Sequence, residues 1–196
     1  SGDSQYLKYS LQQTRRVIEI TKRMSDKFQC VAPPLIVANV GGFSLDQPIP
    51  KDKVEALYLR LGESLAELRG DGVEIIPQTM APFPWHFGGQ RFQNLFLEAP
   101  EIIKWSAELG LRICLDVSHS KLTSNRFGAD FYEFINAVGD LVAHIHLGDA
   151  SGLNGEGLQI GDGEIDFERL SSILQTKCPK AGFIPEIWQG HKDSGS

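Results

Sequence analysis

Residues 112–122 read RICLDVSHSKL, and the pattern in this stretch decides the fold. A short apolar run at 113–115 ends abruptly in Asp116, and His119 follows three positions later. A brief, unbroken apolar run is typical of a strand buried on both faces, as in a parallel sheet.

The same pattern recurs on both sides of this stretch, with amphipathic segments between the apolar runs. The amphipathic segments carry apolar residues at spacings of three and four, which predicts helices. Strands are predicted at 33–42, 73–79, 112–118, 142–148 and 182–188, and helices at 5–28, 54–70, 100–110, 129–139 and 166–175. Because parallel strands need crossovers of about a dozen residues, this alternation predicts a parallel sheet wrapped in helices.

Two α/β architectures fit this alternation: a doubly wound sheet and a (β/α) TIM barrel. The segment GGFSLDQP at 41–48 follows the first strand, but it lacks the third glycine and the helix start of a nucleotide-binding fingerprint. The barrel is therefore favoured. With 41% hydrophobic and 22% charged residues, the chain 1–196 is expected to form a single globular domain.

Composition also limits the function. No apolar run reaches the roughly 18 residues of a membrane span, and no signal peptide is evident, so a cytoplasmic protein without membrane contact is expected. The net charge of −6 and the absence of basic clusters disfavour nucleic acid as a partner. Cys30, Cys114 and Cys178 are odd in number and widely spaced, which indicates neither a disulfide framework nor a zinc knuckle.

In such barrels the chemistry lies where the strands end, because the carboxyl ends form the concave rim. Four consecutive predicted strands each end in potential ligands: Gln78, then Asp116 with His119 just beyond it, then His144 and His146 with Asp149 after them, and then Glu186. A convergent set of this kind is what a divalent cation such as Mn²⁺, Mg²⁺, Co²⁺ or Zn²⁺ needs. The sequence therefore predicts a metal site.

Each residue also has a simpler interpretation. Asp116 can merely cap a following turn, His119 can be an ordinary loop histidine, and His146 can be a buried imidazole without a metal. Glu186 is harder to explain in this way, because a carboxylate in an apolar strand is costly unless it is paired or bound to a metal. His144 and His146 share one face of their strand by the period of two.

The loop after the Gln78 strand, MAPFPWHFGGQRFQNLF at 80–96, is rich in aromatic residues. Aromatic faces suit a sugar ring, and Trp85 and His86 are the expected substrate contacts, together with His144 and Asp149. The alternative is that the loop packs only on neighbouring loops. A second loop, at 152–166, is rich in glycine and could approach a ligand with backbone amides.

Five motifs in this order resemble the xylose isomerase-like barrels, the superfamily of sugar isomerases and epimerases that includes the apurinic endonuclease IV type. The resemblance extends from about residue 7 to 192. The motifs are PFPWHFGGQ (82–90), DVSHS (116–120), HIHLGDA (144–150), GEGLQIGDGEIDF (155–167) and PEIW (185–188).

In the ketose epimerase branch, the resemblance implies a metal held by glutamate, aspartate, histidine and glutamate on four successive strands. These positions fall on Gln78, Asp116, His146 and Glu186, with His119 as a substrate contact or further ligand. The resemblance also implies that the metal stabilises an enediolate while a proton moves between neighbouring carbons. Glu186 and His119 are the expected catalytic residues of a sugar isomerase or epimerase.

Gln78 departs from the family pattern. An amide oxygen can coordinate a metal but cannot take up a proton near neutral pH. Only Glu186 among the ligands can then serve as base, which favours isomerisation or a one-base elimination over two-base epimerisation. A non-catalytic or substrate-binding barrel is an alternative, and so is a metal phosphodiesterase, although the loop at 152–166 lacks the histidine that this class uses.

Chain length is the second departure, because a complete barrel needs about 250 residues. By family order the five predicted strands match the last five of eight, so we expect the C-terminal portion of a longer chain. An open sheet would expose an apolar edge. A missing N-terminal segment or a homo-oligomer is expected to cover it.

Overall fold

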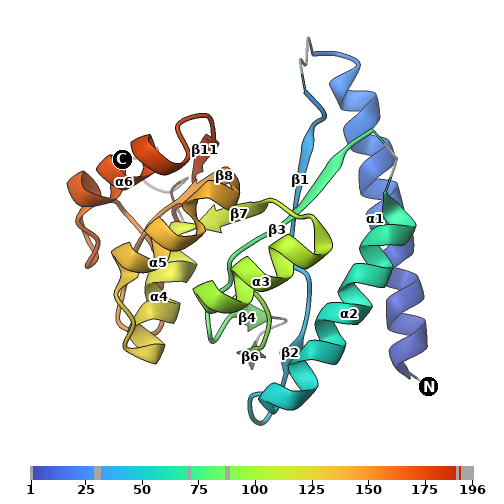
Figure 1. Cartoon of the computed structure of the whole chain (residues 1–196), viewed down its shortest axis with the longest axis horizontal. Helices are drawn as coiled ribbons and strands as arrows, with labels where there is room; N and C mark the ends of the chain where they lie inside the picture. The colour runs from blue at the N-terminus through green and yellow to red at the C-terminus, as the bar shows by residue number, and fades with distance from the viewer. Residues whose placement is uncertain (1, 29–31, 70–71, 87–88, 189, 191–196) are drawn as a thin grey trace.

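Five parallel strands form the central layer of the computed structural model, which describes residues 2–28, 32–69, 72–86, 89–188 and 190 (Figure 1). The strands are β1 (Leu35–Ala38), β3 (Glu74–Pro77), β7 (Ile113–Asp116), β8 (Val142–Leu147) and β11 (Gly182–Pro185). Parallel pairing joins β1 to β3, β7 to β8 and β8 to β11, and a parallel bridge from Gln78 to Cys114 joins β3 to β7. The predicted succession of parallel strands is confirmed.

The helices correspond to the five predicted ones with one addition. They are α1 (Gly2–Ser25), α2 (Lys51–Leu68), α3 (Ala99–Leu109), α4 (Val117–Phe127), α5 (Phe131–Val138) and α6 (Phe167–Lys177), with a short 3₁₀ turn at Gly139–Leu141. The sequence prediction missed α4 and extended the preceding strand to residue 118. The reason is that the buried face of α4 is mostly polar, so it shows no clear apolar stripe.

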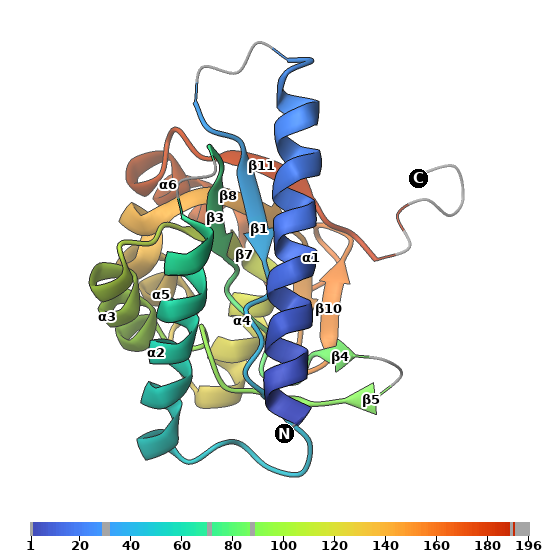
Figure 2. The same ribbon diagram turned by 90° about the vertical axis from the view of Figure 1, so that its right-hand side faces the viewer.

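Three short antiparallel pairs lie in the connections that leave the parallel strands: one joins two distant segments, and the other two are hairpins. β2 (Phe43–Ser44) pairs with β6 (Phe92–Gln93), β4 (Trp85–His86) pairs with β5 (Gly89–Gln90), and β9 (Asp149–Ser151) pairs with β10 (Gly155–Leu158). In Figure 2 the β4–β5 hairpin lies beyond the carboxyl end of β1. These antiparallel pairs therefore lie in the connections at the rim where the strand-end residues are found.

The larger core lies between the parallel strands and the helices. It includes Leu115, Ile135 and Trp105, and the Trp105 ring stacks on Tyr58 with ring centroids 4.6 Å apart. Because side chains alternate along a strand, Cys114 and Asp116 face the opposite, inner side of the sheet. Cys114 packs there in a small second cluster with Ile76 and Ala143.

The strands that the structure describes do not close into a barrel. Within the described residues β1 pairs only with β3, and β11 pairs only with β8. Phe183 and Ile184 of β11 are 63% and 54% exposed, as expected for a strand with one free edge. Across the same described ranges, none of the helices combines the length and apolar character needed to cross a bilayer.

Candidate metal centre

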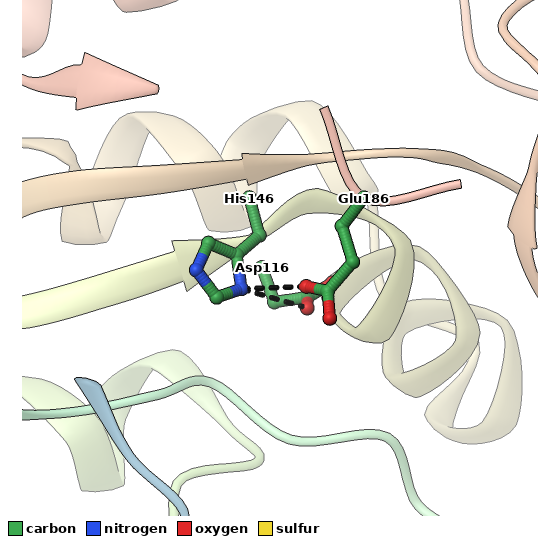
Figure 3. Close-up of side chains that lie close together, drawn as sticks. All are labelled: Asp116, His146 and Glu186. Carbon is green, nitrogen blue, oxygen red and sulfur yellow. Dashed lines mark ion pairs between the residues drawn. The ribbon is translucent and has the colours of Figure 1, made fainter. Parts of the chain in front are cut away.

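Three of the predicted ligands converge at the carboxyl ends of neighbouring strands. Asp116 ends β7, it stands opposite His146 of β8 in the parallel register, and Glu186 follows β11 directly. One ligand atom from each of the three lies within 4.8 Å of the other two. Figure 3 shows the imidazole of His146 with both carboxylates on one side of it.

The His146 imidazole lies between the two carboxylates. Its Nδ1 atom is 2.6 Å from Glu186 Oε2 and 3.8 Å from Asp116 Oδ2. Although this nitrogen is buried, it makes no well-directed hydrogen bond within the described part of the chain. Such an atom facing two carboxylates fits a ligand of a cation, because a metal takes the lone pair that no protein donor uses.

The charges around His146 favour a cation at this point. Contacts with Asp116, Cys114 and Glu186 raise the pKa of His146 to about 12, against a smaller opposing effect of burial. Burial alone would raise the pKa of Asp116, but His119 and His146 hold it below its ordinary value. The site therefore keeps Asp116 ionised and attracts positive charge, whether a proton or a divalent ion.

Asp116 is placed for both of the functions that the sequence left open. Its Oδ1 accepts the backbone N–H of His119 at 2.9 Å, which caps the start of α4. Its Oδ2 faces His146 and also accepts an N–H of Gln78 at 2.6 Å. The cap fixes the carboxylate at the strand end, so the structural and the ligand interpretations are compatible.

Gln78 is buried beside this cluster, and it is the amide nitrogen that faces Asp116. The same nitrogen is 3.4 Å from Nδ1 of His119. The structure thus brings Gln78 to the predicted place at the end of β3. Its part as a metal ligand stays a prediction, because the amide must turn its oxygen toward the ion.

His119 is buried in the first turn of α4, and both of its ring nitrogens face acceptors. Nδ1 is 3.0 Å from the carbonyl oxygen of Thr79, and Nε2 is 3.0 Å from Oε1 of Glu156. Burial lowers the pKa of His119, but the carboxylates of Asp116 and Glu156 outweigh this effect and raise it to about 9. Its role as ligand or catalyst stays a prediction.

Glu156 is the residue near the cluster that sequence reasoning missed. It lies in β10 and contacts His119 across 37 positions of the sequence. In the sequence, the loop at 152–166 stands out only through its glycines. The motif alone carried no signal for Glu156, because an antiparallel hairpin and not a strand end brings it to the rim.

The other predicted substrate contacts lie in different surroundings. Asp149 is fully buried, and its carboxylate accepts the backbone N–H groups of Ala150, Gly161, Gly163 and Ile165. This arrangement orders the loop after β10, and the structure does not bring Asp149 into the cluster.

His144 packs against His146 with the rings edge to face and their centroids 5.4 Å apart. Burial and the neighbouring His146 lower its pKa. Trp85 and His86 form β4, and their side chains lie outside the described part of the structure. The substrate contacts therefore stay predictions.

The architecture and the strand-end cluster define a parallel β/α protein of the TIM-barrel class. A profile for the family described as Xylose isomerase-like TIM barrel matches residues 1–195, so the chain belongs to that family. The resemblance drawn from the sequence motifs is confirmed.

Individual relatives are more distant. The chain is 34% identical over 77 residues to the "Uncharacterized protein MJ1311" of Methanocaldococcus jannaschii, covering 37% of this chain and 26% of that protein. It is similar to the crystal structure of a D-tagatose 3-epimerase-like protein, with TM-score 0.66 and 18% identity over 93% of this chain and 64% of that one. It is also similar to the probable 3-DHS dehydratase AsbF of Bacillus anthracis, with TM-score 0.64 and 13% identity over 92% and 65% of the two chains. At these identities the structural matches show the fold alone, and the chain spans less than two thirds of each of these relatives.

Proposed function

We propose that the chain is a divalent-metal-dependent isomerase or epimerase of a sugar or sugar derivative. The observation that supports this proposal most directly is the convergence of Asp116, His146 and Glu186, in which a buried imidazole nitrogen faces two carboxylates. Two of the similar structures are titled as a D-tagatose 3-epimerase-like protein and an L-ribulose 3-epimerase, which supports this choice of reaction.

The three residues of the cluster have different access to a substrate. The side chains of Asp116 and His146 are 5% and 16% exposed, whereas that of Glu186 is 56% exposed. Asp116 and His146 would hold the metal from the protein side, with Gln78 as the fourth neighbour. Glu186 can contact both the ion and a substrate, so it is the group best placed to move a proton.

A bound divalent ion would supply a positive charge that stabilises an enediolate as it forms. The chain supplies the remaining parts of the reaction. Glu186 would take a proton from the carbon next to a carbonyl group and return it to the former carbonyl carbon, while the hydroxyl proton of the first carbon passes to the former carbonyl oxygen. The cap by the His119 N–H and the hydrogen bond from Gln78 hold Asp116 in place during this transfer.

A non-catalytic, substrate-binding barrel is the second function that an observation favours. The amide nitrogen of Gln78 occupies one oxygen of Asp116, as it would in a site that has given up a metal ligand. A metal phosphodiesterase is less well supported, because the net charge is −6 and the loop at 152–166 contains no histidine.

Metal binding and turnover separate these functions. We expect calorimetry to show one Mn²⁺ bound per chain, and Asp116→Asn to weaken the binding at least tenfold while the protein stays folded by circular dichroism. A panel of ketoses and aldoses, assayed with added Mn²⁺, should then reveal one interconverted pair. If Mn²⁺ binds and no sugar reacts, the substrate-binding function is favoured; if no divalent ion binds, the metal-dependent proposal fails.

A further inference from the structure

Glu156 contacts the site from a different element than any strand-end residue. Its Oε1 is 3.0 Å from His119 Nε2, and its side chain is 24% exposed. We propose that Glu156 is a second acid/base carboxylate of this site, oriented by His119, which performs the proton transfer that Gln78 cannot. This inference rests on the proposed function and extends it from one-base to two-base chemistry.

The β9–β10 hairpin is held against both halves of the cluster. The backbone N–H of Gly157 donates to Ser118 Oγ at 2.8 Å, beside the capped start of α4. On the other side, the backbone N–H of Trp188 donates to the carbonyl oxygen of Gly157 at 2.8 Å, two residues after Glu186. Glu156 therefore projects from a segment fixed between the Asp116 side and the Glu186 side.

Close packing maintains this placement. Gly157 has a φ of +63°, and a Cβ atom there would lie 2.1 Å from the ring of Trp188. A Cβ atom on Gly148 would lie 2.8 Å from the carbonyl oxygen of Glu186 and 3.3 Å from Cα of Gly157. The absence of both side chains lets the hairpin approach the end of β11, so Glu156 lies at the same rim as Glu186.

The other acid/base groups beside the cluster are less suitable for this role. Each ring nitrogen of His119 already lies 3.0 Å from a protein oxygen, of Thr79 or of Glu156, so neither nitrogen is turned toward a substrate. Cys114 is fully buried. Glu156 uses one oxygen on His119, and a carboxylate has a second oxygen that can accept a proton. A base held by a neighbouring side chain is a common catalytic arrangement.

The proposed reaction is epimerisation at a carbon next to a carbonyl group. The Glu156 carboxylate removes the proton, and the electrons of the broken C–H bond form the enediolate. The Glu186 carboxylic acid then delivers a proton to the opposite face, which restores the carbonyl group with inverted configuration. Glu156 ends protonated and Glu186 ionised, and exchange with water resets both; for the other epimer the two carboxyl groups exchange roles.

Deuterium incorporation distinguishes this pair of bases from a structural contact. Ketoses, including D-fructose and D-tagatose, are incubated in D₂O with Mn²⁺, and NMR follows exchange at the carbon beside the carbonyl together with formation of the epimer. We expect Glu156→Gln to reduce epimer formation at least about 100-fold. In the same Glu156→Gln variant, deuterium exchange of the epimer that Glu186 deprotonates should fall less than fivefold relative to wild type. Glu156→Asp should restore part of the epimer formation.

Two further measurements complete the test. Calorimetry should give the same Mn²⁺ affinity for Glu156→Gln and wild type within about twofold, because Glu156 is not a ligand. Glu164→Gln is the matched control, since Glu164 lies in the same connection and accepts the backbone N–H of Gly152 at 2.9 Å. This control should keep wild-type exchange and epimer formation.

The outcomes are separable. Equal loss of exchange and epimer formation in Glu156→Gln, the same loss in Glu164→Gln, or a more than tenfold weaker Mn²⁺ affinity would each assign Glu156 a structural part and overturn the inference. Unchanged epimer formation would also overturn it and leave the proposed function standing. If the wild type binds Mn²⁺ but exchanges no sugar, the proposed function fails and the inference fails with it.

Discussion

Replacing Gln78 by glutamate should convert a hydrogen bond into a repulsion that a metal relieves. Gln78 Nε2 lies 2.6 Å from Asp116 Oδ2, and both side chains are buried. Two carboxylates at that distance would repel by about 6 kcal/mol at an effective dielectric constant of ~20. A group in this position escapes such repulsion by binding a proton, so the full value is not reached.

The cost of that proton sets the magnitude. Protonating a carboxyl group with an ordinary pKa of ~4.3 at pH 7 costs about 3.7 kcal/mol, and the protonated group can still donate to Asp116. We therefore expect Gln78→Glu to lower the free energy of unfolding by about 2–4 kcal/mol at pH 7 without added metal. The folded-state pKa of the new carboxyl group would be raised above its unfolded value. The penalty should thus shrink as pH falls, to about 1 kcal/mol at pH 5.

Urea unfolding with EDTA and with Mn²⁺ tests the reasoning. A divalent ion shared by both carboxylates removes the repulsion, so Mn²⁺ should stabilise Gln78→Glu more than wild type and bind at least tenfold tighter. An ion at one hundred times its Kd adds about 2.7 kcal/mol of stability. Gln93→Glu is the control, since Gln93 is also buried but donates to the carbonyl oxygens of Gly41 and Leu95. It should lose stability without metal rescue. Equal metal affinity and equal stability in wild type and Gln78→Glu would refute the placement of Gln78 at the site.

Two other predictions follow from contacts elsewhere in the site and core. Because the pKa of His146 is raised to about 12 and a metal needs the neutral imidazole, Mn²⁺ affinity should rise about tenfold per pH unit from pH 6 to 8. Calorimetry in buffers of different ionisation enthalpy should show about one proton released, and a pH-independent affinity would contradict this. Tyr58→Phe should destabilise the fold by about 2–4 kcal/mol in urea, because the buried hydroxyl donates to Glu101 and accepts the N–H of Phe96, and buried groups left unpaired cost about 1–3 kcal/mol each. The hydroxyl supports a strained turn, since Phe96 has a φ of 57°. A decrease in the free energy of unfolding of less than about 0.5 kcal/mol would mean that this turn does not need the hydroxyl.

The sequence predicts the elements of the fold whose buried side chains are apolar. The five strands are short apolar runs, and α2 and α5 carry apolar faces, so local patterns agree with the final packing. The failure at α4 has a physical cause. Ser118, His119 and Thr123 fill its buried face because this helix packs against the polar rim and not only against the outer core. A polar buried face gives no amphipathic signal, and here it marks the neighbourhood of the site.

The sequence predicts the part of the candidate site that is formed by side chains at the ends of parallel strands. That rule gave Asp116, His146 and Glu186, which converge, because parallel neighbours in register bring successive strand ends to one rim. It could not give Glu156, whose position depends on an antiparallel hairpin seated by the contacts of Gly157.

Under the proposed mechanism, Gln78 and Glu156 affect the same proton transfer. Gln78 offers no ionisable group at the end of β3, whereas Glu156 places one beside His119, whose ring is also 3.4 Å from the Gln78 amide. A glutamate at position 78 and the glutamate at 156 would place three acidic groups, with Asp116, around one imidazole. The present arrangement needs only two, so Gln78 and Glu156 are best understood as coupled. Gln78→Glu should then tolerate Glu156→Gln better than the wild type does, and a double-mutant cycle on epimer formation that shows strict additivity would contradict the coupling.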